Sequence, residues 1–330
     1  MNLRQLRYLQ SIAEQGFNVS RAAAALYTSQ SGVSKQIQLL EQEIGVEVLT
    51  RRGNRVLGLT GAGREVLTVA RRMLEDAANV RRIGEEFAGQ NNTLTVATTH
   101  THARYLLCDV IQSFLHSHQG VRLVLRQDSP SRIARLVLSG EADIGISSEP
   151  PEPVEGLLML PFAELHRSVI TPRNHPLLAE TRLTLHAIAQ YPILTLDRSF
   201  VGGSAVLRAF EAAHIEPNIV FSAIDADVVK KYVELGLGIA ILPSIAYERA
   251  RDRNLRAVDA KTLFDPTIAR IEICRDRYLR GAMLDFIGML APKWNRSAIE
   301  RLSRAPSSGS GRRAGRRDGK PQGTGKSQAR

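Results

Sequence analysis

The strongest constraint on the fold is a change of pattern after residue 92. From Thr93 to residue 292, short apolar runs such as TLTVATT, VRLVLRQ, ADIGIS, PILTL and GIAILP alternate with segments of helical periodicity. Strands that alternate with helices are typical of an α/β fold with mostly parallel sheets, because each parallel connection needs a crossover segment. The main part of the chain is therefore predicted to be α/β, within a domain over 90–303.

Two chain crossings would divide this region into two lobes. The proline-containing stretch at 160–163 and the segment 262–267 are plausible crossovers. They place lobe I at about 93–162 and 268–292, and lobe II at about 163–267. Ligands of open α/β sheets bind at the carboxyl ends of the strands, so a ligand cleft is expected between the lobes.

Residues 1–59 have a different, mostly helical pattern. An alanine-rich segment, for which Ser20 is the expected cap, breaks at YTSQ and is followed by a helix with Val33, Ile37 and Leu40 on one face. Two short helices joined by a tight turn indicate a helix-turn-helix, and a plain helical hairpin is the alternative. The polar residues suited to DNA contact are Thr28, Ser29, Gln30, Ser31, Ser34, Lys35 and Gln36.

The next stretch, VEVLTRRGNRVLGLT, has the pattern of a strand, a basic turn and a second strand. Arg51, Arg52 and Arg55 flank the turn and suit contacts with phosphates or the minor groove. A basic hairpin alone is usually only a charged surface. Directly after a helix-turn-helix, it favours a DNA-contacting wing.

Residues 60–89 are predicted to form one long helix that links and pairs subunits. Its apolar residues keep a near-heptad seam: Val66, Ala70, Met73, Ala77, Val80 and Phe87. A long helix with one narrow apolar stripe favours pairing with a second helix. Packing on its own domain is the alternative.

The formal net charge of +11 is concentrated at one end of the chain. Residues 304–330 carry eight Lys or Arg and one Asp, which leaves +4 for the rest. This Gly-, Ser- and Arg-rich segment is predicted to be a disordered basic tail, because it has almost nothing to bury. It could attract nucleic acid without specificity or be only a solvated extension. The high net charge alone is therefore no evidence of DNA binding.

Several function classes find no support in the sequence. No apolar run of about 18 residues is present, which predicts no membrane span. Cys108 and Cys274 form no CxxC pair, a pattern that fits the cytoplasm and gives no zinc site. No catalytic motif was found, so neither an enzyme nor a cofactor is expected. His100 and His102 form an HxH pair, but nearby metal ligands are lacking, and Asp225 is expected to cap a helix.

The stretch AAAALYTSQSGVSKQIQLLEQEIGVEVLTRRGNRVLGLTGAGREVL resembles the N-terminal domain of LysR-type transcriptional regulators. The resemblance implies that Gln30, Ser31, Ser34 and Lys35 read the major groove and that Arg55 is the wing arginine. Residues 93–292 resemble the effector-binding domain of the same family, which is built like periplasmic solute-binding proteins. ATTHTHARY, IAQYPILTL and DADVVKKYVELGLGI are similar to the CysB/Cbl branch, the regulators of sulfur assimilation.

In that branch, the turn after the first strand binds a sulfate-like anion or a small acylated serine. The hydroxyls of Thr99 and Thr101, with the free backbone N–H groups that open the following helix, can bind an oxyanion. The resemblance alone adds Ser148, at the end of another strand, because it matches a hydroxyl position of the family site. The complete set of expected effector-binding residues is Thr99, His100, Thr101, His102, Ser148, Val201 and Gly202.

The chain departs from the branch at two points. The branch carries Gln where this chain has His102, and an FTGR-like turn where this chain reads FVGGS, with Val201 and Gly203. One hydroxyl and one positive charge are therefore missing. A protonated His102 would replace part of the attraction and strengthen binding at lower pH. A neutral His102 that donates a hydrogen bond in place of Gln is the alternative.

The sequence thus predicts a ligand-responsive DNA-binding regulator, controlling sulfate or organosulfur assimilation or cysteine biosynthesis. The alternative is a LysR-type regulator of another pathway that senses a small carboxylate or aromatic acid. A non-regulatory solute-binding protein or enzyme would not need residues 1–60. The expected partners are promoter DNA, RNA polymerase, further copies in a homodimer or homotetramer, and a sulfate-like anion, sulfonate, O-acetylserine or N-acetylserine.

Overall fold

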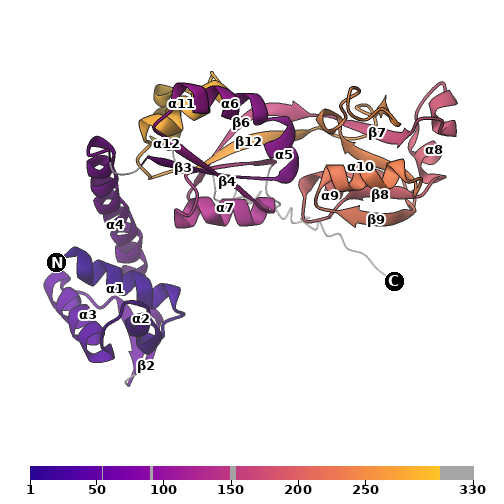
Figure 1. Ribbon diagram of the computed structural model, residues 1–330. Helices are drawn as coiled ribbons and strands as arrows, with labels where there is room; N and C mark the ends of the chain where they lie inside the picture. Colours follow the sequence, from indigo (N-terminus) through magenta and orange to yellow (C-terminus); the bar gives the residue numbers. More distant parts are fainter. Residues whose placement is uncertain (54, 90–91, 149–153, 305–330) are drawn as a thin grey trace, which may run out of the picture.

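The computed structural model describes residues 1–53, 55–89, 92–148 and 154–304. A small N-terminal domain is joined by one long helix to an elongated body of two α/β lobes (Figure 1). The predicted tail at 305–330 lies outside the described residues.

The N-terminal domain consists of three helices and a hairpin. Its elements are α1 (Leu3–Glu14), α2 (Val19–Ala25), α3 (Gln30–Ile44), β1 (Leu49–Arg52) and the antiparallel β2 (Arg55–Leu59). The predicted apolar face of α3 is confirmed, since Val33, Ile37 and Leu40 are buried in the domain core. The expected cap of α2 was wrong: the side chain of Asn18, not Ser20, accepts the N–H of Arg21.

The linker helix α4 (Gly61–Phe87) starts in contact with the hairpin. Thr60 caps it by accepting the N–H of Gly63, and the same hydroxyl donates to the carbonyl of Glu47. A Cβ at Gly63 would lie 1.9 Å from the carbonyl oxygen of Val48, so only glycine fits this approach.

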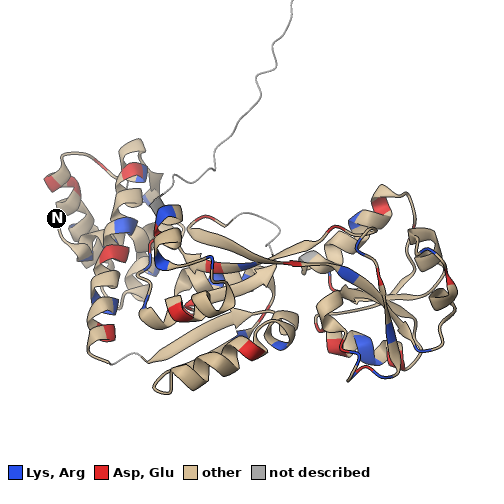
Figure 2. Cartoon of the chain, turned by 90° about the horizontal axis from the view of Figure 1, so that it is seen from above, with Lys and Arg blue, Asp and Glu red and all other residues tan. Residues whose placement is uncertain are grey.

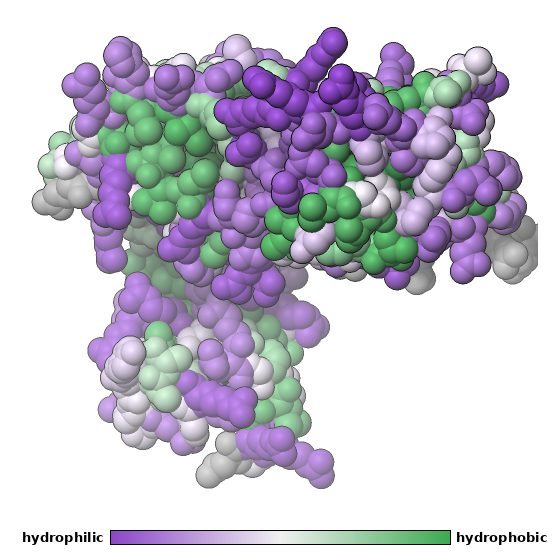
Figure 3. All heavy atoms as spheres, turned by 45° about the vertical axis from the view of Figure 1, so that its right-hand side comes forward, coloured by the Kyte–Doolittle hydropathy of each residue, from purple (hydrophilic) through white to green (hydrophobic). Residues whose placement is uncertain are grey.

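The predicted seam of α4 is covered at one end and open at the other. Ala70 is buried against the N-terminal domain, whereas Val80 and Phe87 are 71% and 83% exposed. Apolar surface follows the neck between the lower domain and the upper body (Figure 3). A single chain therefore leaves the second half of the seam without a partner.

Lobe I is built on a five-stranded sheet in the order β4-β3-β5-β12-β6. Its strands are β3 (Thr93–Thr98), β4 (Arg122–Gln127), β5 (Ile144–Ser148), β6 (Leu157–Leu165) and β12 (Thr267–Cys274). Its helices are α5 (His100–Tyr105), α6 (Cys108–Ser117), α7 (Pro130–Ser139), α11 (Gly281–Leu290) and α12 (Arg296–Arg304). The core against α6 and α11 includes Phe114, Phe286 and Ile299, so the lobe continues past the expected end at residue 292.

Lobe II contains the second sheet, in the order β11-β7-β10-β8-β9. Its strands are β7 (Arg167–Pro172), β8 (Ile193–Leu196), β9 (Ile219–Ala223), β10 (Ile239–Pro243) and β11 (Leu255–Asp259). Its helices are η1 (Pro176–Ala179), α8 (Leu185–Ala189), α9 (Val201–Ala212), α10 (Ala226–Glu234) and η2 (Ser244–Ala246). As expected, the side chain of Asp225 caps α10 by accepting the N–H of Asp227.

The prediction of mostly parallel sheets was wrong. In each sheet two strand pairs are parallel and two are antiparallel. The antiparallel pairs involve the strands that lead into or out of the crossings, β6, β7, β11 and β12, which run against their neighbours. The first crossing is at residue 166, because Pro161 is accommodated within β6 near a register shift opposite Arg270.

The linker helix is fastened to lobe I, at the segment between β12 and α11. Asn79 donates from Nδ2 to the carbonyl of Asp276 and accepts the N–H of Tyr278 at Oδ1, both at 2.7 Å. At the penultimate residue of α4, Glu86 accepts the N–H of Gly281 at 2.7 Å. These contacts position the N-terminal domain relative to lobe I.

Candidate effector cavity and DNA-contacting surface

A small cavity, about 30 Å³ in volume, lies where the two lobes meet. It brings together the carboxyl-end residues of β3, β5 and β8 with residues of the crossing strands. The lining residues are Thr99, Thr101, His102, Pro130, Ser148, Leu165, Leu196, Phe200, Gly202, Pro243 and Thr267.

Thr99 and His102 form a paired hydrogen-bonding unit at the start of α5. The Thr99 hydroxyl accepts the backbone N–H of His102 at 3.4 Å and lies 2.5 Å from its Nδ1. Since the hydroxyl still has its own hydrogen to donate, we assign Nδ1 as the acceptor and place the ring hydrogen on Nε2. Nε2 is buried without a partner, so this N–H is available in the cavity wall.

Burial lowers the pKa of His102 from 6.5 to about 4. The imidazole is therefore neutral near neutral pH in the unliganded protein. Of the two alternatives left open by the sequence, this favours the neutral hydrogen-bond donor over the protonated ring. The Thr99 hydroxyl therefore serves mainly to orient the Nε2–H donor of His102.

The remaining polar lining consists of three hydroxyls. Thr101 stands on α5, Ser148 ends β5, and Thr267 begins β12. Thr267 was missed by the sequence reasoning, as were the apolar lining residues Leu165 and Phe200. Nothing in the local pattern marks them, because they reach the cavity through the two crossings and the turn before α9.

The lobe II wall is formed by the first turn of α9. No side chain caps this helix, and Gly202 lines the cavity. A Cβ at Gly203 would lie 2.3 Å from the carbonyl oxygen of Leu196, so this position accepts no side chain without a backbone shift. The side chain of Val201 lies outside the described residues.

His100 does not share the cavity, contrary to expectation. It lines a separate hollow on the other side of α5, with its Nδ1 3.9 Å from Oδ2 of Asp225. Successive helix residues are rotated by about 100°, so Thr101 and His102 can face the cavity while His100 does not. In the described ranges, no group of three His, Cys, Asp or Glu is placed to hold a metal.

Helix α5 is also linked to lobe II by polar contacts. Arg104 pairs with Asp227 at 2.6 Å, and the hydroxyl of Tyr105 donates to the same carboxylate at 2.6 Å. Lys230 donates to the Tyr105 hydroxyl at 3.0 Å. The network joins α5 to α10, so the cavity walls are held together by polar contacts across the lobes.

The second candidate surface is the N-terminal end of α3. Ser29 caps the helix, and Gln30, Ser31 and Lys35 are exposed. The expected residues Thr28, Ser34 and Gln36 are partly buried. Ser20 donates to Oε1 of Gln30 at 2.9 Å, so α2 holds the first polar side chain of α3.

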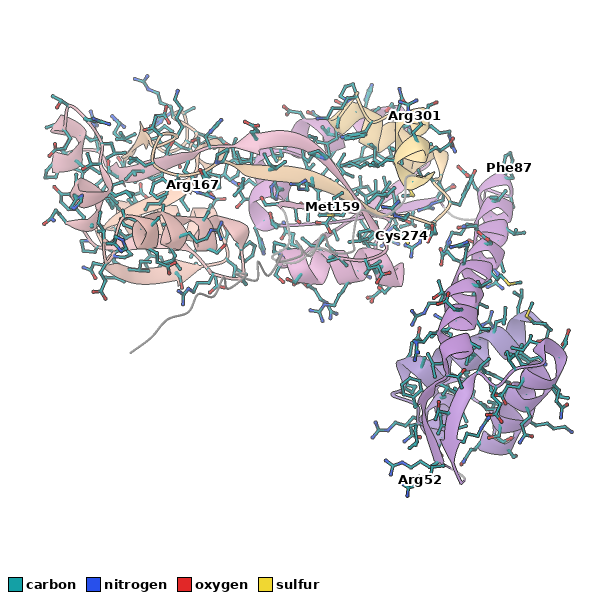
Figure 4. The ribbon with its side chains drawn as sticks, turned by 180° about the vertical axis from the view of Figure 1, so that it is seen from behind. Arg52, Phe87, Met159, Arg167, Cys274 and Arg301 are labelled. Atoms are coloured by element: carbon teal, nitrogen blue, oxygen red, sulfur yellow. The ribbon has the colours of Figure 1, made fainter. Side chains whose placement is uncertain are left out.

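The hairpin presents Arg52 and Arg55, but Arg51 has another role. Arg52 projects from the far tip of the hairpin (Figure 4), and Arg55 is exposed. Arg51 instead makes a two-point ion pair with Glu41, at 3.1 and 2.9 Å. Glu41 also accepts the N–H groups of Val48 and Leu49, so the Arg51 guanidinium fastens the hairpin to α3.

Charged residues of one sign do not concentrate on any one domain of the described chain. Basic and acidic residues are interspersed over the N-terminal domain and both lobes (Figure 2). No helix among the described residues is both long and apolar enough to span a membrane.

Both parts of the chain match family models. Residues 3–64 match the "Bacterial regulatory helix-turn-helix protein, lysR family", and residues 87–295 match the "LysR substrate binding domain". Among solved structures, the cofactor-binding domain of the Cbl transcriptional regulator is 36% identical, with a TM-score of 0.62, and covers 64% of this chain and 93% of that one. The structure of CbnR, a LysR family transcriptional regulator, shares the fold at a TM-score of 0.52 and 23% identity, over 88% of this chain and 100% of that chain.

Curated relatives align over nearly their whole length. The HTH-type transcriptional regulator SsuR of Burkholderia cenocepacia is 45% identical, covering 92% of this chain and 99% of SsuR. CysB of Haemophilus influenzae is 40% identical, covering 92% of this chain and 94% of CysB. The chain belongs to the LysR family and is a DNA-binding transcriptional regulator with an N-terminal helix-turn-helix and a two-lobed effector domain.

Proposed function

We propose that this regulator controls genes of sulfate or organosulfur assimilation or cysteine biosynthesis, acting on promoter DNA in the cytoplasm. Its effector is a small oxyanion or sulfonate, or an acylated serine such as O-acetylserine or N-acetylserine. The observation that carries the proposal is the set of hydrogen-bond donors around one interlobe cavity. Similarity to SsuR, CysB and Cbl supports the same pathway.

The cavity offers donors from both lobes. Lobe I supplies the hydroxyls of Thr101, Ser148 and Thr267 together with Nε2–H of His102. Lobe II supplies the uncapped first turn of α9 at Gly202. Anionic oxygens are good acceptors for such fixed dipoles, which cost no reorganisation when the ligand binds.

DNA recognition then follows from the N-terminal domain. α3 enters the major groove with Gln30, Ser31, Ser34 and Lys35, and the hairpin brings Arg52 and Arg55 to the backbone or minor groove. The open seam of α4 pairs with a second copy, which places two such units on one duplex. A homodimer or homotetramer then controls access or contact of RNA polymerase.

Effector binding must favour one arrangement of lobes or subunits over another, because only differential affinity can shift the equilibrium. The cavity and the Arg104–Asp227 pair both join α5 to lobe II. A ligand held by both walls therefore stabilises one relative position of the lobes.

A second candidate is supported by the apolar lining of the cavity. Leu165, Leu196 and Phe200 line it together with two prolines. A small carboxylate with an apolar body would use this surface while its charge contacts α5. In that case the regulated pathway is a different one.

Titration calorimetry of the full chain separates these candidates. The ligands are sulfate, thiosulfate, O-acetylserine, N-acetylserine, a sulfonate and benzoate. We expect a sulfur-pathway ligand to bind, and Thr101→Val to weaken binding by about tenfold or more through loss of a hydrogen bond to a charged group. Thr181→Ala, at an exposed position in lobe II, is the matched control.

The pH dependence gives an independent check. With a neutral His102, sulfate affinity should be the same at about pH 6 and about pH 8, on either side of the ordinary histidine pKa. Binding of benzoate alone would favour the second candidate. Absence of binding by every ligand would refute the proposed effector class.

A further inference from the structure

Arg167, the first residue of β7, is a buried cation with unpaired donor nitrogens. Its residue surface is 1% exposed, and its Nε and Nη2 atoms have no hydrogen-bond partner. It lies within lobe II, near the strands that cross from lobe I (Figure 4). A guanidinium group is normally buried only when its N–H donors have hydrogen-bond acceptors.

The guanidinium lies next to the lobe II wall of the effector cavity. Its Nη1 and Nη2 are 3.5 and 3.7 Å from the position that a Cβ would take at Gly202. Across the β7–β10 ladder, Arg167 is paired with Pro243, and Leu165 precedes it by two residues. Gly202, Pro243 and Leu165 all line the cavity, so the charge stands directly behind this wall.

The protein supplies little to offset this charge. In the part of the chain that the structure describes, Arg167 forms no ion pair with an Asp or Glu. Burial, with a further contribution from the charge of Arg208, lowers its pKa to about 10. The cation is therefore retained although its surroundings disfavour it, and a second positive charge stands nearby.

We propose that Arg167 is the counter-charge for the anionic group of the effector. It selects ligands that bring net negative charge to the lobe II wall beside Gly202, where a side chain is absent. The ligand class is a doubly charged tetrahedral oxyanion such as sulfate, in preference to a zwitterion such as O-acetylserine. The inference rests on the proposed effector cavity and adds the residue that sets its charge preference.

Replacement of Arg167 should change the melting temperature in opposite directions, depending on whether the residue is an unpaired buried cation or a structural arginine. Arg167→Gln removes a destabilising charge, so the melting temperature of the ligand-free protein should stay the same or rise. The increase in melting temperature that sulfate gives the native protein should be lost. A structural arginine would instead lower the melting temperature when replaced.

Calorimetry on the full chain measures the charge preference itself. Sulfate affinity should fall by about 30-fold or more in Arg167→Gln, the range for removal of one partner of a buried charge pair. O-acetylserine affinity should change much less. Arg167→Lys keeps the charge and should restore part of the sulfate affinity.

A second pair of variants tests the idea without removing the arginine. Gly202→Asp places a carboxylate beside the guanidinium, in the first turn of α9, where an acidic side chain is favourable. It should stabilise the ligand-free protein and abolish sulfate binding. Gly202→Asn has the same shape without the charge and should retain more sulfate affinity.

The outcomes separate the two proposals. If the native chain binds sulfate and Arg167→Gln binds it equally well, the inference is wrong and the effector cavity stands. If Gly202→Asp and Gly202→Asn bind sulfate alike, the inference is wrong even where Arg167→Gln fails to fold. If the native chain binds no anion, both are overturned.

Discussion

The hydroxyl of Ser147 donates a hydrogen bond to Oε1 of Glu272, and Oε2 of the same carboxyl group has no partner. The two residues lie on the adjacent strands β5 and β12, beneath the end of the strand that brings Ser148 to the cavity. Burial raises the pKa of Glu272 from 4.5 to about 7. The folded state therefore holds this proton more tightly than the unfolded state.

This relationship predicts a loss of stability as the pH rises. The protonated Glu272 side chain contributes to the free energy of unfolding. This contribution is fully present below the unfolded pKa of 4.5 and is lost as the pH rises through the folded pKa of about 7. The full effect is about 3 kcal/mol, from about 1.4 kcal/mol per pKa unit. Glu272→Gln should remove it, so denaturant unfolding across this range should show a flatter profile. Glu164→Gln, at an exposed position on β6, should leave the native profile intact.

A side chain at Gly203 should destabilise lobe II. The nearest backbone oxygen would be 2.3 Å from the added Cβ. Gly203→Ala should cost about 1–3 kcal/mol, as overpacked sites do, and should weaken effector binding by shifting the start of α9. Gly288→Ala, at a helical glycine with open space, is the control and should not destabilise the protein. Equal melting temperatures for the two variants would contradict the close approach.

The polar end of α3 should carry the sequence specificity. Gln30→Ala or Ser34→Ala should weaken binding to a preferred promoter site by about 1–3 kcal/mol, with a smaller effect on unrelated DNA. Fluorescence anisotropy with both duplexes measures the difference. Gln42→Ala, at an exposed position three turns along the same helix, should bind like the native protein. A uniform loss on both duplexes would assign these residues to the backbone instead.

Two neighbouring arginines of the hairpin should behave differently. Arg51→Ala removes the ion pair with Glu41 and should destabilise the N-terminal domain by about 1.5–3 kcal/mol. Arg52→Ala should leave stability unchanged and reduce the slope of log K against log salt by about one, the effect of one lost phosphate contact. Melting curves and salt titrations of both variants distinguish the roles. The assignment fails if Arg51→Ala is as stable as Arg52→Ala.

Asn79 should couple the effector domain to the DNA-binding domain. Asn79→Ala breaks both hydrogen bonds to residues 276 and 278, so α4 is held less firmly on lobe I. Effector affinity should be unchanged, while the ratio of DNA affinities with and without effector should move toward one. Asp76→Ala, at an exposed position on the same helix, should keep the native ratio. An unaltered ratio in Asn79→Ala would mean that coupling uses another route.

Local periodicity was sufficient to predict α3, most of the strands and one wall of the cavity. The spacing of Val33, Ile37 and Leu40 defines the inner face of α3, and Thr99 starts α5 where the apolar strand stops. Both features depend on residues within a few positions of each other. They are therefore visible in the sequence before any tertiary contact is known.

Several features that the sequence did not reveal involve contacts between distant parts of the chain. The basic turn gave no indication that Arg51 is paired with Glu41 on the preceding helix. Thr267 reaches the cavity only because β12 returns from lobe II to lobe I. Arg167 was overlooked, because an arginine within a strand pattern is ordinarily a surface residue.

The attachment of α4 to lobe I alone has a consequence for signalling. In the described chain, Asn79 and Glu86 bond to residues 276–281, all in lobe I. A rotation of lobe II about the crossings at 166 and 260–266 would leave the DNA-reading helix of its own chain in place. An isolated subunit would thus bind the effector without conveying it to DNA, and transmission would require lobe II to contact another subunit.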